Sequence, residues 1–474
     1  MTRIYALTDS HQESRNLSLA LSGIYQFEKD HHDKFLILDA GDIFKGIYDK
    51  NLSVNAYLKI KELLPQAQIF LTLGNNDFGF KKSDFEYLKD TIKNFKNAKI
   101  HMICANILDS KTQEKPHWID THKIIELDGV KILITGFCLN NSCAKKFGYD
   151  LISAEESYDN LIKTIDKDYD KIIILYHHWY TYSKALKDFA PEIDLIIGGH
   201  EHSPITPDYE NNIFYPLSFA RTLFQMDFGK NIENIKQIEV NEFSFTPEFE
   251  RPIIEYEKAT NLKTPIAKRV LNLTKKYSDA CPLGTFISDA MRKTGNTDIA
   301  FHSTGFTMYP MRLEDSEFIT KYDIDQVICA ESTIEKIEIT SAQLKEVFEN
   351  TTTFRMHKDR GNQKFLQCSQ NMSIQGKHFR NKEYKIVQIT INGENLLDKN
   401  SNPINPNRTF TCTIDPYIGA GEQGFTVLKN LPKTKVLQQG QEIPLNKLFK
   451  NALIEAEKNF DGNPNYPCFE YLDL

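Results

Sequence analysis

The sequence has little of what marks several common classes of protein. Only two of its 474 residues are tryptophan, and its eight cysteines are scattered without a Cys-x-x-Cys pair or the spacing of a zinc finger. This spacing argues against a thiolate zinc site and against the disulfide framework of small secreted proteins. We therefore expect reduced cysteines and a cytoplasmic protein.

Long apolar runs and positive net charge are also missing. No run approaches the roughly 20 residues that cross a membrane, and the first residues lack the apolar segment and cleavage site of a signal peptide. We therefore expect no membrane partner. The formal net charge of −7 argues against binding of duplex nucleic acid, because affinity for the phosphate backbone needs a basic surface.

What is present is the composition of an ordinary globular protein, with 41% hydrophobic and 26% charged residues. In the first half, apolar β-favouring runs alternate with apolar residues at helical spacing, which predicts an α/β fold with a parallel sheet. Prolines and charges after residue 245 predict a domain boundary, and we expect a connecting helix at 265–277. The predicted domains are residues 1–245, a linker of residues 246–280, and a mixed α/β domain of residues 281–474.

Polar residues that can bind a metal follow five of the predicted strands. They are Asp9, His11, Asp42, Asn75, His177, His200 and His202. Singly, each has a structural interpretation as a turn residue, a helix cap or a hydrogen-bonded histidine. Together they predict one site, because the carboxyl ends of parallel strands lie at the same edge of a sheet. Oxygen and nitrogen ligands without thiolate favour Mn, Zn, Fe or Co.

The order Asp-x-His, Gly-Asp, Gly-Asn-x-Asp, His, Gly-His-x-His resembles the signature of the calcineurin-like metallophosphoesterases. The resemblance implies an N-terminal β-sandwich flanked by helices, with two divalent metal ions that activate a water molecule to hydrolyse phosphate esters. It implies that one metal is held by Asp9, His11 and His202. It also implies that the second is held by Asn75, His177 and His200, and that Asp42 bridges the two.

Two positions depart from that family's pattern. Members commonly carry histidine after the asparagine ligand, whereas this chain has Asn76, and the acidic partner expected three residues later is Gly79. An amide donates a hydrogen bond but not a proton, so general-acid catalysis worth typically 10²–10⁴-fold is expected to be missing unless His178 supplies it. A phosphodiesterase or pyrophosphatase, whose leaving groups need less help, and a metal-binding pseudoenzyme therefore remain alternatives.

The second half is similar to another known domain. Residues 283–292, Leu-Gly-Thr-Phe-Ile-Ser-Asp-Ala-Met-Arg, resemble the segment that opens the 5′-nucleotidase C-terminal domain, and the stretches 339–345, 365–369 and 417–425 continue the match. The resemblance implies a substrate-binding domain in which Phe365 and Tyr417 stack on the base of a nucleotide. The family's Gly-Gly-Ile-Arg and Gly-Gly-Asp elements are altered here.

These alterations lead to two further expectations about substrate binding. Gln423 stands where a ribose-binding aspartate is usual, and it still offers hydrogen bonds to a hydroxyl. The lost arginine is replaced by Arg312, Arg355 or Arg360. The chain as a whole predicts a cytoplasmic, two-metal phosphomonoesterase of the 5′-nucleotidase type, active in nucleotide catabolism on a small-molecule phosphoester, with no prediction of oligomeric state.

Overall fold

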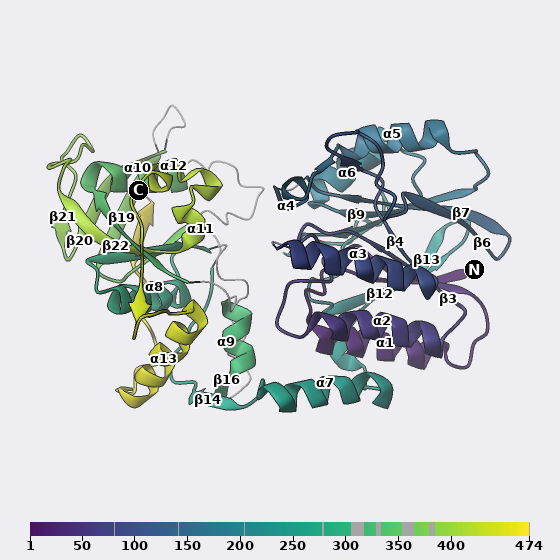
Figure 1. The fold of residues 1–474 in the computed structure, drawn as a ribbon, viewed down its shortest axis with the longest axis horizontal. Coiled ribbons are helices and arrows are strands. Elements are labelled where there is room, and N and C mark those ends of the chain that lie inside the picture. The colour runs from purple at the N-terminus through teal and green to yellow at the C-terminus, as the bar shows by residue number, and fades with distance from the viewer. Residues whose placement is uncertain are drawn as a thin grey trace. The chain divides into compact units, whose positions relative to one another are not determined.

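The computed structural model describes residues 1–79, 81–140, 142–202, 204–276, 279–304, 317–328, 333–352, 365–378 and 384–473. The chain forms two compact units, Met1–Ala259 and Thr260–Leu474, each of which is described by itself (Figure 1). No helix in the described ranges is long and apolar enough to cross a membrane.

The first unit contains two large β-sheets. In hydrogen-bonded order, the first sheet comprises β13 (Ile232–Glu239), β12 (Thr222–Phe228), β1 (Thr2–Leu7), β2 (Phe35–Asp39), β3 (Ala67–Thr72) and β4 (Ile100–Ile103). The second comprises β11 (Ile213–Phe214), β10 (Leu195–Gly199), β9 (Lys171–His177), β7 (Val130–Cys138) and β6 (His122–Leu127). Strands β1 to β4 are parallel to one another, and so are β7, β9, β10 and β11.

The two sheets pack face to face and are covered by helices on their outer faces. Leu36 and Phe70 from the first sheet share an apolar core with Ile134 and Leu175 from the second, and all four are 0% exposed. The outer face of the first sheet is covered by α1 (Ser14–Glu28), α2 (Lys50–Leu63) and α3 (Lys82–Asn97). The second is covered by α5 (Ala154–Thr164) and α6 (Tyr180–Phe189) (Figure 1). The predicted sandwich flanked by helices is confirmed.

Shorter elements complete the first unit. They are α4 (Ser142–Lys146), β5 (Ile107–Asp109), β8 (Tyr149–Leu151), the 3-10 turn η1 (Val240–Glu242) and α7 (Pro247–Thr260). The Arg15 guanidinium donates to the Glu257 carboxylate, which also accepts from the Tyr48 hydroxyl at 2.5 Å, so α7 is fastened to the first unit.

The helix expected at 265–277 is not formed by the described residues of that range, and this prediction was wrong. Pro265–Lys268 is strand β14, which pairs antiparallel with β16 (Phe318–Thr320). Beyond it, the backbone N–H of Asn272 donates to Pro464 instead of to a helical carbonyl four residues earlier. The apolar residues of this segment pack against distant parts of the second unit, and Leu273 is only 2% exposed.

The second unit is mixed α/β, as expected. Its larger sheet comprises β18 (Leu366–Cys368), β15 (Ile299–Ser303), β22 (Thr409–Ile414), β17 (Glu335–Thr340) and β23 (Thr434–Lys435). Its smaller sheet comprises β21 (Glu394–Asn395), β20 (Tyr384–Ile391), β19 (Met372–His378) and β26 (Glu470–Asp473). A hairpin pairs β24 (Leu437–Gln438) with β25 (Gln441–Glu442).

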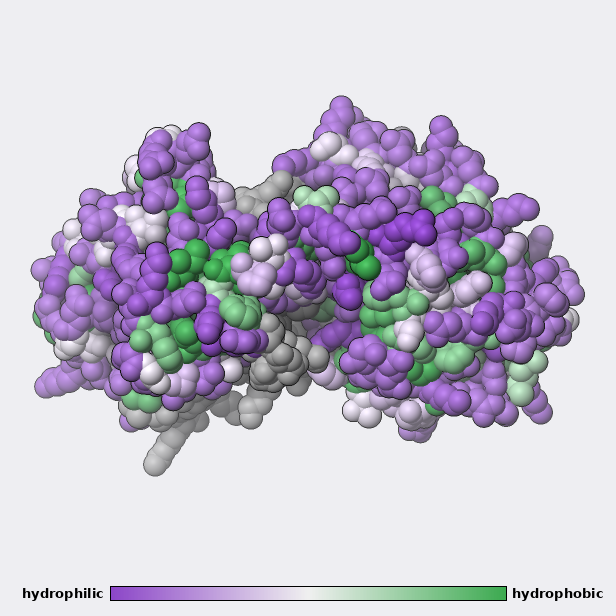
Figure 2. All heavy atoms as spheres, turned by 90° about the horizontal axis from the view of Figure 1, so that it is seen from below, coloured by the Kyte–Doolittle hydropathy of each residue, from purple (hydrophilic) through white to green (hydrophobic). Residues whose placement is uncertain are grey.

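The helices of the second unit pack on these sheets in two apolar clusters. They are α8 (Pro282–Gly295), α9 (Lys321–Val327), α10 (Ser341–Thr352), α11 (Pro416–Gly419), η3 (Glu422–Gly424), α12 (Thr426–Lys429) and α13 (Leu445–Lys458). The visible face in Figure 2 is mostly hydrophilic on both units, with hydrophobic residues in small groups.

Candidate metal centre

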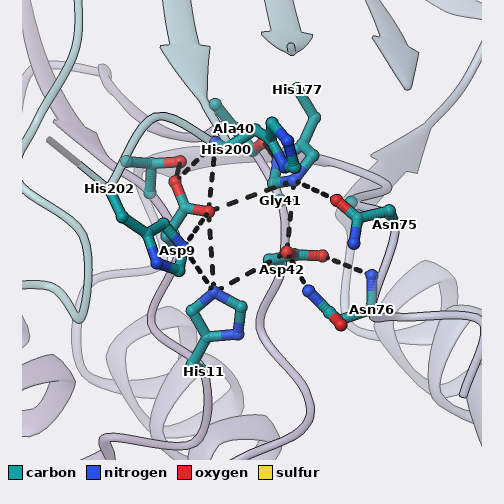
Figure 3. Close-up of polar contacts among 12 residues, drawn as sticks. Asp9, His11, Ala40, Gly41, Asp42, Asn75, Asn76, His177, His200 and His202 are labelled. Carbon is teal, nitrogen blue, oxygen red and sulfur yellow. Dashed lines mark hydrogen bonds and ion pairs between the residues drawn. The ribbon is translucent and has the colours of Figure 1, made fainter. Parts of the chain in front are cut away.

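The loops that follow five strands of the first unit bring the predicted ligands to one place. Asp9 and His11 follow β1, Asp42 follows β2 and Asn75 follows β3, all in the first sheet. His177 ends β9, and His200 and His202 follow β10, in the second sheet. Figure 3 shows their side chains directed toward one another. The structure therefore brings these residues together, as the sequence predicted.

The backbone of these loops is strained where it presents the ligands. Asp9, His11, Asp42 and His200 have φ values of 47°, 45°, 59° and 76°, in the left-handed region that non-glycine residues rarely adopt. Such strain is commonly retained at functional sites because the surrounding structure enforces it. Gly74 allows the loops to close, since a Cβ there would lie 2.1 Å from Asp42 Oδ1.

The potential ligands fall into two groups of three. The ligand atoms of Asp9, His11 and His202 lie within 4.8 Å of one another, and so do those of Asp42, His177 and His200. In the first group, the Nε2 atoms of His11 and His202 are 3.1 Å apart, and Asp9 Oδ1 is 3.7 Å and 3.6 Å from them. Two neutral imidazole nitrogens at that distance repel unless a proton or a cation lies between them.

Asp42, a member of the second group, also lies close to the first. Its Oδ2 is 3.2 Å from Nε2 of His177 and 3.6 Å from Nε2 of His11. Asn75 joins the second group, with its Oδ1 atom 3.2 Å from His177 Nε2. The Nδ1 atom of His177 is 2.8 Å from the Ala40 carbonyl, a hydrogen bond that orients the ring with Nε2 toward the site.

Buried charges set the protonation of the site. Burial alone would raise the pKa of Asp42, but the charge and hydrogen bond of His177 hold it well below its usual range. Burial lowers the pKa of His11 to about 4 and that of His200 to about 3. Burial also disfavours the charged ring of His177, but Asp42 and Asp9 raise its pKa to about 10.

These observations fit a pair of divalent cations. The site combines carboxylates with imidazole rings, at His11 and His200, that are neutral at pH 7, the protonation states in which both groups bind metal. A cation bound beside the carboxylates of Asp9 and Asp42 would oppose their effect on His177 and favour its neutral, metal-binding form. Oxygen and nitrogen donors of this kind can hold divalent metal ions.

Asn76 is turned toward Asp42. Its backbone N–H donates to Asp42 Oδ1 at 2.7 Å, and its side-chain Nδ2 donates to Asp42 Oδ2 at 2.6 Å. The Asn76 Oδ1 atom accepts from the Lys45 ammonium at 3.1 Å. Asn76 therefore orients the carboxylate between the two groups.

His178 points elsewhere. It lies directly after β9, and its side chain packs against α6. Its ring lies 3.8 Å from that of Tyr182, centroid to centroid, and its Nδ1 accepts the backbone N–H of Trp179. The proton-supplying role of His178 stays a prediction, and this geometry gives it no support.

Two residues to which the sequence gave no role also belong to the site, and one of them, Asp77, ends the Gly-Asn-x-Asp motif. The buried Asp77 carboxylate accepts the backbone N–H groups of Asp42, Phe44 and Gly74, at 2.8–3.0 Å. The Lys45 ammonium donates to the Asn76 side chain. Both lie inside the loops that carry ligands, and a charged residue one to three positions after a ligand is the signal that would have found them.

The predicted substrate-binding residues of the second unit differ in how exposed they are. Phe365 is only 1% exposed and packs against Phe469 in the apolar core, whereas Tyr417 is 46% exposed in α11. Phe365 is thus a core residue in this structure, and its role in base stacking stays a prediction. Gln423 is half-buried, with an Oε1 atom that has no hydrogen-bond partner among the described residues. Arg312, Arg355 and Arg360 lie outside the described residues.

Comparisons with known proteins agree with this arrangement. Residues 2–204 match the calcineurin-like phosphoesterases, and residues 258–430 match the 5′-nucleotidase C-terminal domain. The chain is 21% identical over 426 residues to the uncharacterized metallophosphoesterase YunD of Bacillus subtilis, covering 83% of this chain and 89% of YunD. It is 22% identical over 454 residues to a 5′-nucleotidase of Diplobatis ommata, covering 83% and 75% respectively.

The fold is also shared with a solved structure. The crystal structure of a 5′-nucleotidase precursor from Thermus thermophilus superposes with a TM-score of 0.73 at 17% identity, covering 99% of both chains. The two domain matches follow one another in the order that the motifs predicted. The chain therefore belongs to the calcineurin-like phosphoesterases, a family of phosphoester hydrolases, and carries a 5′-nucleotidase C-terminal domain.

Proposed function

We propose that this protein removes the phosphate group from nucleoside 5′-monophosphates. The observation that carries the proposal is the position of Asp42, whose Oδ2 lies within 3.6 Å of an imidazole nitrogen from each of the two ligand groups. A carboxylate shared in this way suits a site for two cations. The match to the 5′-nucleotidase C-terminal domain supports a nucleotide as the substrate.

The residues that would hold the cations follow from the two groups. Asp9, His11 and His202 would hold one, Asn75, His177 and His200 would hold the other, and Asp42 would contact both. Two such ions, when bound, supply Lewis-acid activation of water and neutralise the charge of the phosphate. We propose Mn, Zn, Fe or Co as the metals.

The chain's own groups orient this chemistry. Asn76 and the backbone loops held by Asp77 fix the Asp42 carboxylate, so the site is preorganised before substrate binds. In the second unit, Tyr417 offers an exposed aromatic ring for a base, and Gln423 Oε1 offers an acceptor for a ribose hydroxyl. A cytoplasmic location and a place in nucleotide catabolism stay predictions from the sequence.

A second candidate is favoured by Asn76. An amide cannot deliver a proton to the leaving oxygen, so substrates with better leaving groups lose less by its presence. Phosphodiesters and pyrophosphates of nucleotides are such substrates. A pseudoenzyme that binds metal and ligand without turnover is the third possibility.

The test is phosphate release by the full chain from nucleoside mono-, di- and cyclic phosphates and an activated aryl phosphate, with added Mn, Co, Zn or Mg. We expect turnover of nucleoside monophosphates that falls by at least about 10²-fold in Asp42→Asn. Turnover limited to diesters, anhydrides or the aryl ester would favour the second candidate. Absence of any turnover with both metals bound would favour the pseudoenzyme.

A further inference from the structure

Lys45 is a positively charged residue inside the loop that carries the shared carboxylate. Its ammonium nitrogen is 3.1 Å from Oδ1 of Asn76, whose Nδ2 is in turn 2.6 Å from Oδ2 of Asp42. The ammonium group is thus one side chain away from the centre of the metal site. The sequence patterns and the proposed ligand sets leave it without a role.

The direction of these hydrogen bonds is determined by chemistry. A carboxylate only accepts and an ammonium only donates, so the amide of Asn76 must present Nδ2 to Asp42 and Oδ1 to Lys45. In this orientation the Lys45 ammonium and the Asp42 carboxylate are joined through a single amide group.

The backbone that carries Lys45 is tied down on both sides. On one side, the N–H of Phe44 donates to Asp77 at 3.0 Å. On the other, the N–H of Gly46 donates to the side chain of Gln12, and a Cβ at Gly46 would overlap the His11 carbonyl. Lys45 is therefore presented by a loop whose position is coupled to the ligand loops.

The conformation of Lys45 is itself unusual. Its φ of 69° lies in the left-handed region, which lysine has no intrinsic reason to adopt. Glycine or asparagine would meet this backbone requirement with less strain. This strained position lies in the loop that carries Asp42, and backbone strain of this kind clusters at functional sites.

We propose that Lys45 binds a non-bridging oxygen of the substrate's terminal phosphate and so favours phosphomonoesters over phosphodiesters. The inference rests on the proposed function, because it concerns the same site. A terminal phosphate carries one more negative charge than a diester, so an added cation stabilises the monoester more.

Lys45 takes no part in the covalent changes. In hydrolysis, an oxygen–phosphorus bond forms from water and the bond from phosphorus to the leaving oxygen breaks, with its electron pair leaving on that oxygen. One proton of the water ends on the leaving group and the other stays on the product phosphate. Lys45 keeps its charge and its contact to a phosphoryl oxygen throughout.

The variants are chosen to suit the positive φ of Lys45. Lys45→Asn removes the charge but suits a positive φ, and Lys45→Arg keeps the charge. Lys99→Asn is the matched control, since Lys99 is an exposed lysine with a φ of 59°. Each full-length protein is loaded with Mn²⁺, its bound metal is measured, and its affinity for inorganic phosphate is determined by calorimetry.

We expect Lys45→Asn to weaken phosphate binding by at least about tenfold, the range for a hydrogen bond between charged groups. Bound metal should be unchanged, Lys45→Arg should recover most of the affinity, and Lys99→Asn should match the natural protein. The ratio of monoester to diester turnover should fall in Lys45→Asn alone.

Unchanged phosphate affinity in Lys45→Asn, with metal still bound, would overturn the proposal and leave Lys45 as a support for Asn76. A loss that is confined to esters with poor leaving groups would also overturn it, because Lys45 would then act on the leaving oxygen. If the natural protein hydrolyses no ester but binds phosphate through Lys45, the proposed function fails and this inference stands.

Discussion

Asp77 shows how single residues hold the site together without binding metal. Its buried carboxylate accepts three backbone N–H groups, from Asp42, Phe44 and Gly74. These donors belong to two different loops, after β2 and after β3. The Asp77 side chain therefore links the loops that carry Asp42 and Asn75.

We predict that Asp77→Ala lowers the free energy of unfolding of the first unit by about 3 kcal/mol or more, because three buried donors lose their acceptor and each costs about 1–3 kcal/mol. The measurement is chemical denaturation in the presence of a chelator, which removes any contribution of bound metal. Asp90→Ala, on the exposed face of α3, is the control and should change stability by less than about 0.5 kcal/mol. Equal effects of the two substitutions would contradict the prediction.

At the residue scale, the sequence predicted the ligands but not their supports. Asp9, His11, Asp42 and the later ligands stand directly after apolar runs, so their convergence follows from the geometry of a parallel sheet. The roles of Asp77 and Lys45 depend on which loops touch, and tertiary contacts of this kind leave no periodic trace in a sequence. Phe365 illustrates the converse, since its motif suggested a binding role and the structure buries it.

At the scale of elements, the sequence predicted a strand or helix correctly where its apolar residues were continuous or recurred with a clear period. The β-favouring apolar run that begins at Phe35 predicts a strand at 35–39, and β2 is Phe35–Asp39, buried on both faces in the middle of its sheet. The segment 265–277 failed because apolar spacing cannot distinguish a helix from an irregular stretch that is buried by distant contacts. In the structure, β14 pairs with β16 and Asn272 donates to Pro464, so these residues are not helical.

The second unit offers a prediction about pH at this scale. His302 on β15 is fully buried and its Nδ1 is 3.0 Å from the Ser288 hydroxyl, which donates to the Gln367 carbonyl. Burial, and then the charge of Lys275, lower the pKa of His302 to about 3. The unfolded chain, with a pKa near 6.5, therefore binds a proton that the folded chain does not between about pH 3 and 6.5.

Stability of the second unit should therefore fall by about 1.4 kcal/mol for each pH unit below about 6.5. His302→Asn keeps the hydrogen-bond donor to Ser288 and removes the titration. We expect the difference in unfolding free energy between the natural protein and this variant to change with that slope from about pH 6.5 to 5. A difference that is independent of pH would exclude His302 as the source.

At the scale of the whole molecule, the chain consists of two units with separate apolar cores, and all of the proposed metal ligands belong to the first. Two family matches in the expected order support this organisation. The overall plan could be predicted from the sequence because each domain carries its own motifs.

Removal of metal should therefore affect one unit more than the other. A ligand present at about 100 times its dissociation constant stabilises the state that binds it by about 2.7 kcal/mol. We expect a chelator to speed hydrogen exchange in β1, β2 and β3 but not in α8 or β15. The same loss of protection in both units, or in neither, would contradict the assignment, and Asp42→Asn should show a smaller response to the chelator.

The most direct test of the central claim is an anomalous difference map from crystals of the full chain grown with Mn²⁺. We expect two peaks about 3.5–4 Å apart, one beside Asp9, His11 and His202, the other beside Asn75, His177 and His200, with the Asp42 carboxylate touching both. A single peak, or two peaks with Asp42 bound to only one, would contradict the claim that Asp42 unites two metal sites.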